Sequence, residues 1–299
     1  MTGGSGYRFR SDHTRGGITE VGSNETDEKF GSTKIADFLQ EKLGGINAHD
    51  YNAINQHKQL IEDKLKNEFE VENVRFGGSH STHTDVKNLS DIDMLADLGN
   101  FTTDKSSDQV INDFANAIRE RLPNTTISSG VMAVTVEFSD GLQVQVLPAF
   151  RYRDGYRIPD PNGKGWISTY PKRFSRELTS INQKQSRQVV PTIKLVKSIC
   201  DANNVKVSSY HVSNMAVNVF KHYAGPMTQQ KMLQHFFNKA KSLCLRPTVD
   251  PSKQTQYIDS DLSSSERKRM AGNFAQIESK IKKATESPSL DKWKDIFKK

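Results

Sequence analysis

The stretch of sequence that decides the fold is Phe76-Gly77-Gly78-Ser79, followed after eleven residues by Asp91-Ile92-Asp93. An apolar strand is predicted over residues 71–76, directly before the glycines, and another over residues 91–96. Glycines let the backbone approach a phosphate closely, with N–H groups directed at it, and a serine hydroxyl adds a donor. We therefore expect Gly78 and Ser79 to bind phosphate.

Asp91 and Asp93 lie two residues apart on a predicted strand. Successive side chains of a strand point to opposite faces, so both carboxylates share one face while Ile92 points to the other. Two carboxylates beside a phosphate-binding turn suit a divalent cation, which completes its shell with phosphate oxygens and water. We therefore expect Mg²⁺ (or Mn²⁺) as the cofactor, bound with a nucleoside triphosphate (NTP).

A β-hairpin is predicted from two alternating segments, residues 134–138 and 142–146. A three-residue turn with Gly141 in the left-handed region pairs Phe138 with Leu142 and Val136 with Val144. This register places the polar side chains Glu137 and Gln145 together on the face opposite the apolar ones.

The chain divides into three predicted parts. Residues 1–32, with seven glycines and almost no apolar pattern, are expected to form a flexible tail. Residues 33–185 form an α/β core that ends in a loop-rich segment over residues 151–172. Residues 186–299 form a helical C-terminal domain, with helices expected at 190–201, 210–223, 228–244, 263–284 and near 290–297.

Composition excludes several classes of protein. Two cysteines, Cys200 and Cys244, cannot make a disulfide framework or a cysteine-rich metal site, and both are expected to be packing residues. With no run of about 18 apolar residues and no apolar signal segment, we expect a cytoplasmic protein that does not span a membrane. The formal net charge of +7 suits a protein that handles nucleotides or nucleic acid.

The Gly-Gly-Ser and Asp-Ile-Asp pair resembles the signature of the DNA polymerase β-like nucleotidyltransferase superfamily. More closely, the chain resembles the bacterial CD-NTases of antiviral CBASS operons, relatives of cyclic GMP–AMP synthase and oligoadenylate synthetase. Residues 144–150, VQVLPAF, are similar to the strand that carries the third carboxylate in that family. The resemblance implies an α/β (α+β) fold, with a polymerase β-like core built on a mixed sheet, a helical C-terminal domain and an active site in the cleft between them.

The resemblance also implies further nucleotide-binding residues. Lys194 and Lys197 match a basic helix whose side chains contact the triphosphate. In the S-Y stretch at Ser209 and Tyr210, the hydroxyl touches phosphate and the tyrosine stacks on the base. Taken without the resemblance, the lysines would be ordinary surface residues and Tyr210 a core aromatic. His80 is expected on a flap that faces the nucleotide rather than in a zinc site.

One residue departs from the family pattern, because Gln145 occupies the third carboxylate position among the catalytic residues Asp91, Asp93 and Gln145. Glutamine offers only a neutral carbonyl oxygen where the family has a charge. Three interpretations remain open: an engineered inactivation, a natural protein with reduced or altered chemistry, or compensation by Glu137.

The resemblance implies a nucleotidyltransferase that makes a cyclic or linear oligonucleotide second messenger from NTPs in anti-phage defence. The product would act on a separate downstream effector. One alternative is a transferase that nucleotidylates protein or RNA, and another is a catalytically silent sensor that binds nucleotide or nucleic acid. A nucleic-acid activator is not expected, because the chain has no zinc-ribbon insertion of the animal DNA-sensor type.

Overall fold

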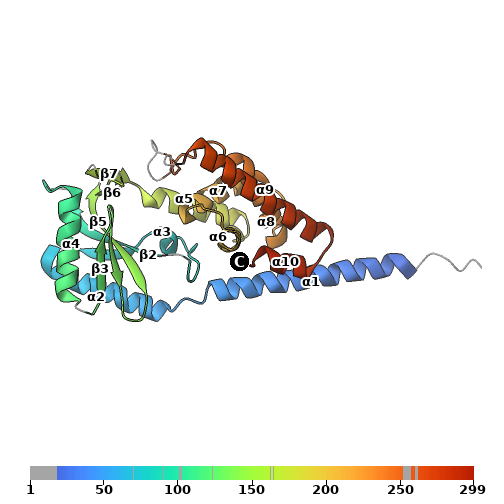
Figure 1. The fold of residues 1–299 in the computed structure, drawn as a ribbon, viewed down its shortest axis with the longest axis horizontal. Coiled ribbons are helices and arrows are strands. Elements are labelled where there is room, and N and C mark those ends of the chain that lie inside the picture. Colours follow the sequence, from blue (N-terminus) through green and yellow to red (C-terminus); the bar gives the residue numbers. More distant parts are fainter. Residues whose placement is uncertain are drawn as a thin grey trace, which may run out of the picture.

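The computed structural model describes residues 19–299 apart from residues 70, 90, 101–102, 123, 162, 164, 252–256 and 260–261. A mixed β-sheet with its own helices lies beside a larger helical body, and the long helix α1 runs along the latter (Figure 1). The helices are α1 (Thr19–Ile46), α2 (Tyr51–Phe69), α3 (Gly78–Ser81), α4 (Ser107–Arg121), α5 (Pro171–Lys184), α6 (Val189–Ala202), α7 (Ser209–Phe220), α8 (Gln229–Leu243), α9 (Ser264–Glu286) and α10 (Leu290–Ile296). The strands are β1 (Asn73–Phe76), β2 (Ile92–Asn100), β3 (Thr126–Ser129), β4 (Val134–Glu137), β5 (Gln143–Tyr152), β6 (Gly155–Pro159) and β7 (Trp166–Thr169).

The sheet has the order β1-β2-β5-β4-β3, with β6 and β7 added beyond β5. Among the strands that the structure describes, the pair β2–β5 alone is parallel, and the other pairs are antiparallel. The predicted α/β fold with a mixed sheet is therefore confirmed. Parallel pairing of β2 with β5 requires the chain to cross over between them, and α4 with the β3–β4 hairpin makes that connection.

The predicted hairpin register is also confirmed. Val136 pairs with Val144, the Phe138 N–H donates to the Leu142 carbonyl at 2.9 Å, and Gly141 has φ of +83°. The apolar strand residues form one buried cluster with α2 and α4. Because side chains alternate along a strand, the polar residues of β2 and β5 point to the other face, toward the helical body.

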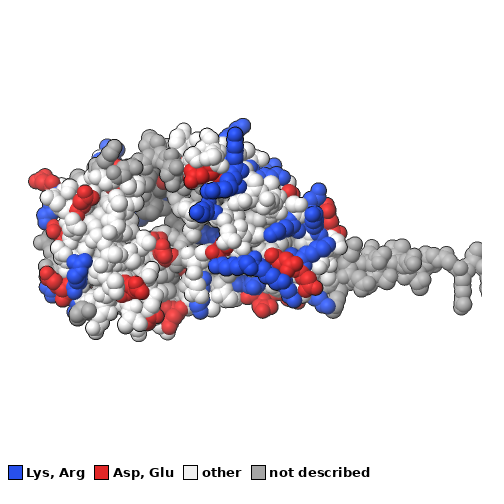
Figure 2. Space-filling model, in the orientation of Figure 1, with Lys and Arg blue, Asp and Glu red and all other residues white. Residues whose placement is uncertain are grey.

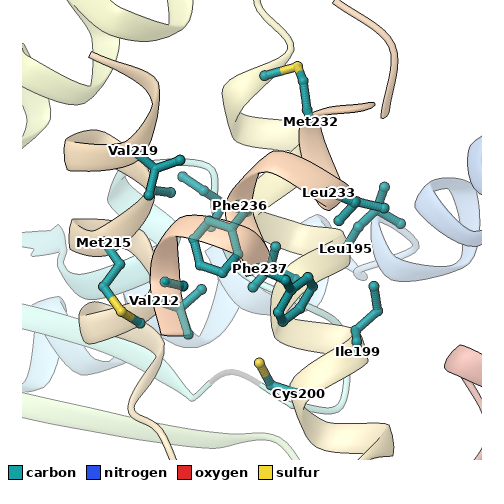
Figure 3. Packing of buried hydrophobic residues seen from close by; sticks show 14 of the residues in the cluster. Leu195, Ile199, Cys200, Val212, Met215, Val219, Met232, Leu233, Phe236 and Phe237 are labelled. Carbon is teal, nitrogen blue, oxygen red and sulfur yellow. The ribbon is translucent and has the colours of Figure 1, made fainter. Parts of the chain in front are cut away.

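The helical body has a core of its own. Phe236 and Phe237 of α8 pack between α6 and α7 against Leu195, Ile199 and Val212 (Figure 3). The helices predicted after residue 186 are all present, and Cys200 and Cys244 are buried in this core as expected. None of the helices that the structure describes combines the length and the apolar character needed to cross a membrane.

Packing divides the chain differently from the predicted boundary at residue 185. Apolar residues of α1, such as Leu39, and of α5, such as Leu178, belong to the helical core rather than to the sheet core. In addition, α1 begins at Thr19, so residues 19–32 are helical where a flexible tail is expected, while residues 1–18 lie outside the described residues. The tail and boundary predictions thus need correction, because glycine content does not exclude a helix and because sequence order does not show which core a helix joins.

The prediction of loops over residues 151–172 is wrong, because β6 and β7 form there. These strands are four or five residues long and exist by pairing with β5 and with each other. Close approach of the strands requires Gly155, where a Cβ atom would overlap the Thr169 carbonyl oxygen. Helix α5 and strand β3 were likewise not expected from the sequence pattern.

Candidate active site

A cleft with a volume of about 1090 Å³ separates the sheet from the helical body. Its walls include Gly78 and Asp93 on the sheet side and Tyr210, Asp250 and Tyr257 on the helical side. A smaller cavity of about 360 Å³ shares Gly78, Asp93, Ser208 and Tyr210 with it, and adds Ser79, Asp91 and Ser209. Figure 2 shows this face of the molecule hollowed between the two parts. The structure thus has a cleft between the sheet and the helical body, where the resemblance implies the active site, and the predicted site residues Asp93 and Tyr210 line it.

The glycine turn is built directly on the aspartate strand. The Gly77 N–H donates to the Asp93 backbone carbonyl at 2.7 Å, which extends the β1–β2 pairing into the turn. Gly78 has φ of +47°, in the left-handed region, and a Cβ atom there would overlap the Asp93 carboxylate. Only glycine therefore allows the turn and the carboxylate to lie in contact.

Sheet register brings Gln145 to the aspartates, as the resemblance implies. Gln145 of β5 is the direct partner of Asp93 in β2, and its Nε2 donates to Asp91 Oδ2 at 3.1 Å. The amide thus holds one carboxylate of the pair by a hydrogen bond and adds no charge of its own. The three predicted catalytic residues Asp91, Asp93 and Gln145 therefore lie together, although Gln145 is 54 residues from Asp91 in the sequence.

The two aspartates form a site that is poor in positive charge. Burial, reinforced by the nearby Asp91 carboxylate, raises the pKa of Asp93 to about 6. A divalent cation would relieve both effects, and Mg²⁺ needs only one or two protein carboxylates when phosphate oxygens supply other ligands. Among the described residues no cluster of three or more Asp, Glu, His or Cys side chains could hold a metal alone. The donor set fits one cation shared with a triphosphate.

The raised pKa of Asp93 predicts a pH-dependent stability. Below about pH 4 the Asp93 carboxyl is protonated in both the folded and the unfolded chain. Between about pH 4 and pH 6 it stays protonated in the folded chain but ionises in the unfolded chain. The free energy of unfolding therefore falls as pH rises through this range. In EDTA, the melting temperature of the wild type relative to Asp93→Asn is expected to fall across this range and then level off. Thermal unfolding at several pH values measures it, and a constant difference would contradict the assignment.

The structure does not support compensation by Glu137. Glu137 pairs with Gln143, whereas the residue opposite Gln145 on β4 is Thr135. Glu137 is on β4, which is separated from the aspartate strand β2 by β5, and neighbouring strands are about 4.8 Å apart. It is also displaced by two residues along the hairpin from the level of Gln145. Sharing a face of the sheet does not bring two side chains to the same cation.

The predicted phosphate-binding lysines do not reach the cleft. Lys194 Nζ donates to Asn47 Oδ1 at 2.7 Å, and Lys197 Nζ donates to the Thr84 carbonyl at 2.7 Å. Both side chains are buried. Burial lowers the pKa of Lys197 to about 7, against the nearby Asp85 charge. Their spacing correctly placed them on one helix face, but that face packs on the segment after the glycine turn instead of lining the cavity.

The serine and tyrosine of α7 do line the site. Ser208 Oγ accepts from the His211 N–H and caps the helix, so that Ser209 and Tyr210 begin α7 at the cavity. The Tyr210 hydroxyl donates to Asp250 Oδ1 at 2.7 Å, and its ring meets Phe174 edge-on with centroids 5.1 Å apart. Tyr210 is thus a wall of the cleft and a partly buried aromatic at once.

Asp250, Phe174 and Tyr257 were not predicted as site residues. Asp250 lies in the segment Arg246–Pro251, whose proline and aspartate pattern was the signal available in the sequence. Phe174 and Tyr257 carry no such signal, since their place in the cleft depends on how α5 and the segment before α9 pack.

Comparison with known proteins agrees with this geometry. Residues 32–182 match the family described as the Second Messenger Oligonucleotide or Dinucleotide Synthetase domain. A probable cyclic nucleotide synthase of Bacillus cereus (strain VD146) is 26% identical over 245 residues, which cover 74% of this chain and 73% of that protein.

Two solved structures show the same fold. The CdnC structure of E. coli MS115-1 with ATP has a TM-score of 0.73 at 17% identity, covering 89% of this chain and 97% of that one. The CD-NTase CdnG of Bradyrhizobium diazoefficiens with GTP has a TM-score of 0.73 at 12% identity, covering 88% and 94%.

Proposed function

Because the chain belongs to the Second Messenger Oligonucleotide or Dinucleotide Synthetase family and has the fold of bacterial CD-NTases, we propose that it joins NTPs into a cyclic or linear oligonucleotide. A hydroxyl of one nucleotide attacks the α-phosphate of another, and pyrophosphate leaves. The observation that carries the proposal is the contact of the Gly78 turn with Asp93, at the wall of a cavity that Asp91 also lines.

The proposal assigns roles to several residues that line the cleft. Gly78 and Ser79 hold phosphate oxygens, and Ser209 supplies a hydroxyl donor across the smaller cavity. Tyr210 presents its ring for base stacking while its hydroxyl is held by Asp250. The volume of the larger cavity is near the upper end of the range for ligand pockets, so it leaves room for more than one nucleotide.

Asp91 and Asp93 would hold Mg²⁺ (or Mn²⁺), which, when bound, neutralises charge on the phosphate oxygens and lowers the pKa of the attacking hydroxyl. Gln145 contributes by orienting Asp91 through its amide N–H. The strand partner of Asp93 is the neutral Gln145, and no third carboxylate joins the two aspartates among the residues that the structure describes, which supports weak turnover in this sequence.

The proposal is tested by incubating the chain with α-labelled NTPs and Mg²⁺ or Mn²⁺. We expect a small labelled product that resists phosphatase when it is cyclic, and no product from Asp93→Asn. Label on a macromolecule would instead support a transferase acting on protein or RNA. Absence of small product from both the wild type and Gln145→Asp would overturn the proposal.

A catalytically silent nucleotide sensor is the second candidate, favoured by the hydrogen bond from Gln145 to Asp91. It predicts NTP binding without release of pyrophosphate, even with aspartate at position 145. If product forms, the resemblance supports a further part of the proposal. The oligonucleotide would then be a cytoplasmic signal that acts on a separate effector in anti-phage defence.

A further inference from the structure

Directly behind the phosphate-binding turn lies a buried cluster that the proposed chemistry does not use. Asp85 is 2% exposed and is its centre. His80 Nδ1 lies 3.0 Å and His49 Nε2 3.2 Å from Asp85 Oδ2, and Lys194 Nζ lies 3.7 Å from Oδ1. Burial opposes the ionised carboxylate, but His80, Lys194 and His49 together hold the pKa of Asp85 below its usual value.

The partners of Asp85 come from separate parts of the fold. His80 belongs to α3 and directly follows Ser79, so it is part of the turn itself. His49 lies between α1 and α2. Lys194 comes from α6 of the helical body and also donates to Asn47, which lies in the same α1–α2 connection as His49. One carboxylate therefore ties the turn on the sheet to α6 of the helical body. Helix α6 in turn packs against α5 and α7, whose residues line the opposite wall of the cleft.

A second link runs parallel to the first. The Thr84 N–H donates to the Ser79 carbonyl at 2.9 Å, and the Thr84 carbonyl accepts from Lys197 Nζ at 2.7 Å. The segment that carries Asp85 thus folds back on the turn and is held by α6 at two successive residues. The lysines expected to bind phosphate act on this segment instead.

From these contacts we propose that Asp85 is a positioning residue, which fixes the Gly78–Ser79 turn against the helical body and so sets the geometry of the triphosphate-binding half of the cleft. The base-binding half, around Tyr210, is built on α7 and the segment of Asp250 and contains no contact to Asp85 in the described structure. The inference rests on the proposed function in one respect, that NTPs bind in this cleft.

The test separates the two halves of the ligand. For Asp85→Asn and the wild type, the Kd of the tightest-binding NTP and of its matching nucleoside is measured with Mg²⁺, by calorimetry or by displacement of a fluorescent nucleotide. We expect NTP affinity to fall about tenfold or more, the scale seen when a supporting partner of a site is lost. Nucleoside affinity should stay within about twofold, because the base-binding half is unchanged.

Two further variants keep the result interpretable. His80→Ala cuts the link on the side of the turn and leaves Asp85 paired with Lys194, so it should show the same selective loss if Asp85→Asn does not fold. Asp140→Asn is the matched control, because Asp140 also pairs with a histidine, His57 at 2.7 Å, but at a hairpin turn away from the cleft. It should leave both affinities unchanged.

Equal losses of NTP and nucleoside affinity, or no loss in either variant, would overturn the proposal. A selective loss in a chain that makes no product would support the positioning role while the proposed synthesis fails. A wild type that binds no NTP would overturn both.

Discussion

Gln145→Asp is expected to raise product formation by about a hundredfold or more. The reason is local electrostatics. Gln145 is the strand partner of Asp93, and its neutral amide donates a hydrogen bond to Asp91. An aspartate at position 145 would instead add a negative charge that can bind a cation. Loss of a supporting partner typically costs about 10–100-fold in metal affinity or activity, and a direct ligand should weigh more.

A second measurement makes this prediction specific to the cation. With a non-hydrolysable NTP analogue, titration with Mn²⁺ should give one more bound ion for Gln145→Asp than for the wild type, because a third carboxylate permits a two-ion site. Gln145→Asn is the matched control, since it shortens the side chain and keeps it neutral. Equal stoichiometry in wild type and Gln145→Asp, with no gain in rate, would favour the silent sensor.

Gly78→Ala is expected to lower NTP affinity and product formation by about a hundredfold, the scale of a misplacement of roughly 1 Å in an active site. Alanine would have to adopt φ of +47° and would overlap the Asp93 carboxylate. The turn or the carboxylate must move, and both are walls of the same cavity. Binding of an NTP analogue and the labelled-product assay measure the two effects.

The control for this glycine is Gly272→Ala. Gly272 lies inside α9, and a Cβ atom there would meet no atom within 4 Å. Alanine should stabilise the helix by about 0.5–1 kcal/mol and leave nucleotide binding unchanged. Wild-type affinity in Gly78→Ala would show that the turn does not hold phosphate.

The residues of the sheet side of the site were predictable from sequence because their geometry is local. Alternation along the chain puts Asp93 of β2 and Asp91, directly before β2, on one face, and Gly77 and Gly78 directly follow β1, which pairs with β2. The hairpin turn at Gly141 fixes the register of β4 with β5, so the face shared by Glu137 and Gln145 was also predictable. Apolar periodicity found the helices from α6 onward for the same reason.

Tertiary structure decided the contacts that distant groups make. The resemblance implies that Gln145 lies with the aspartates, but its pairing with Asp93, and the distance of Glu137 from both, follow from how β5 inserts between β2 and β4. Lys194 and Lys197 share a helix face in the sequence, but only the packing of α6 turns that face toward Asp85 and Thr84 instead of the cleft. The spacing of residues along a helix determines which of them share a helix face. The partners of those side chains depend on the segment that packs against the face, because a buried charged group must be paired or hydrogen-bonded.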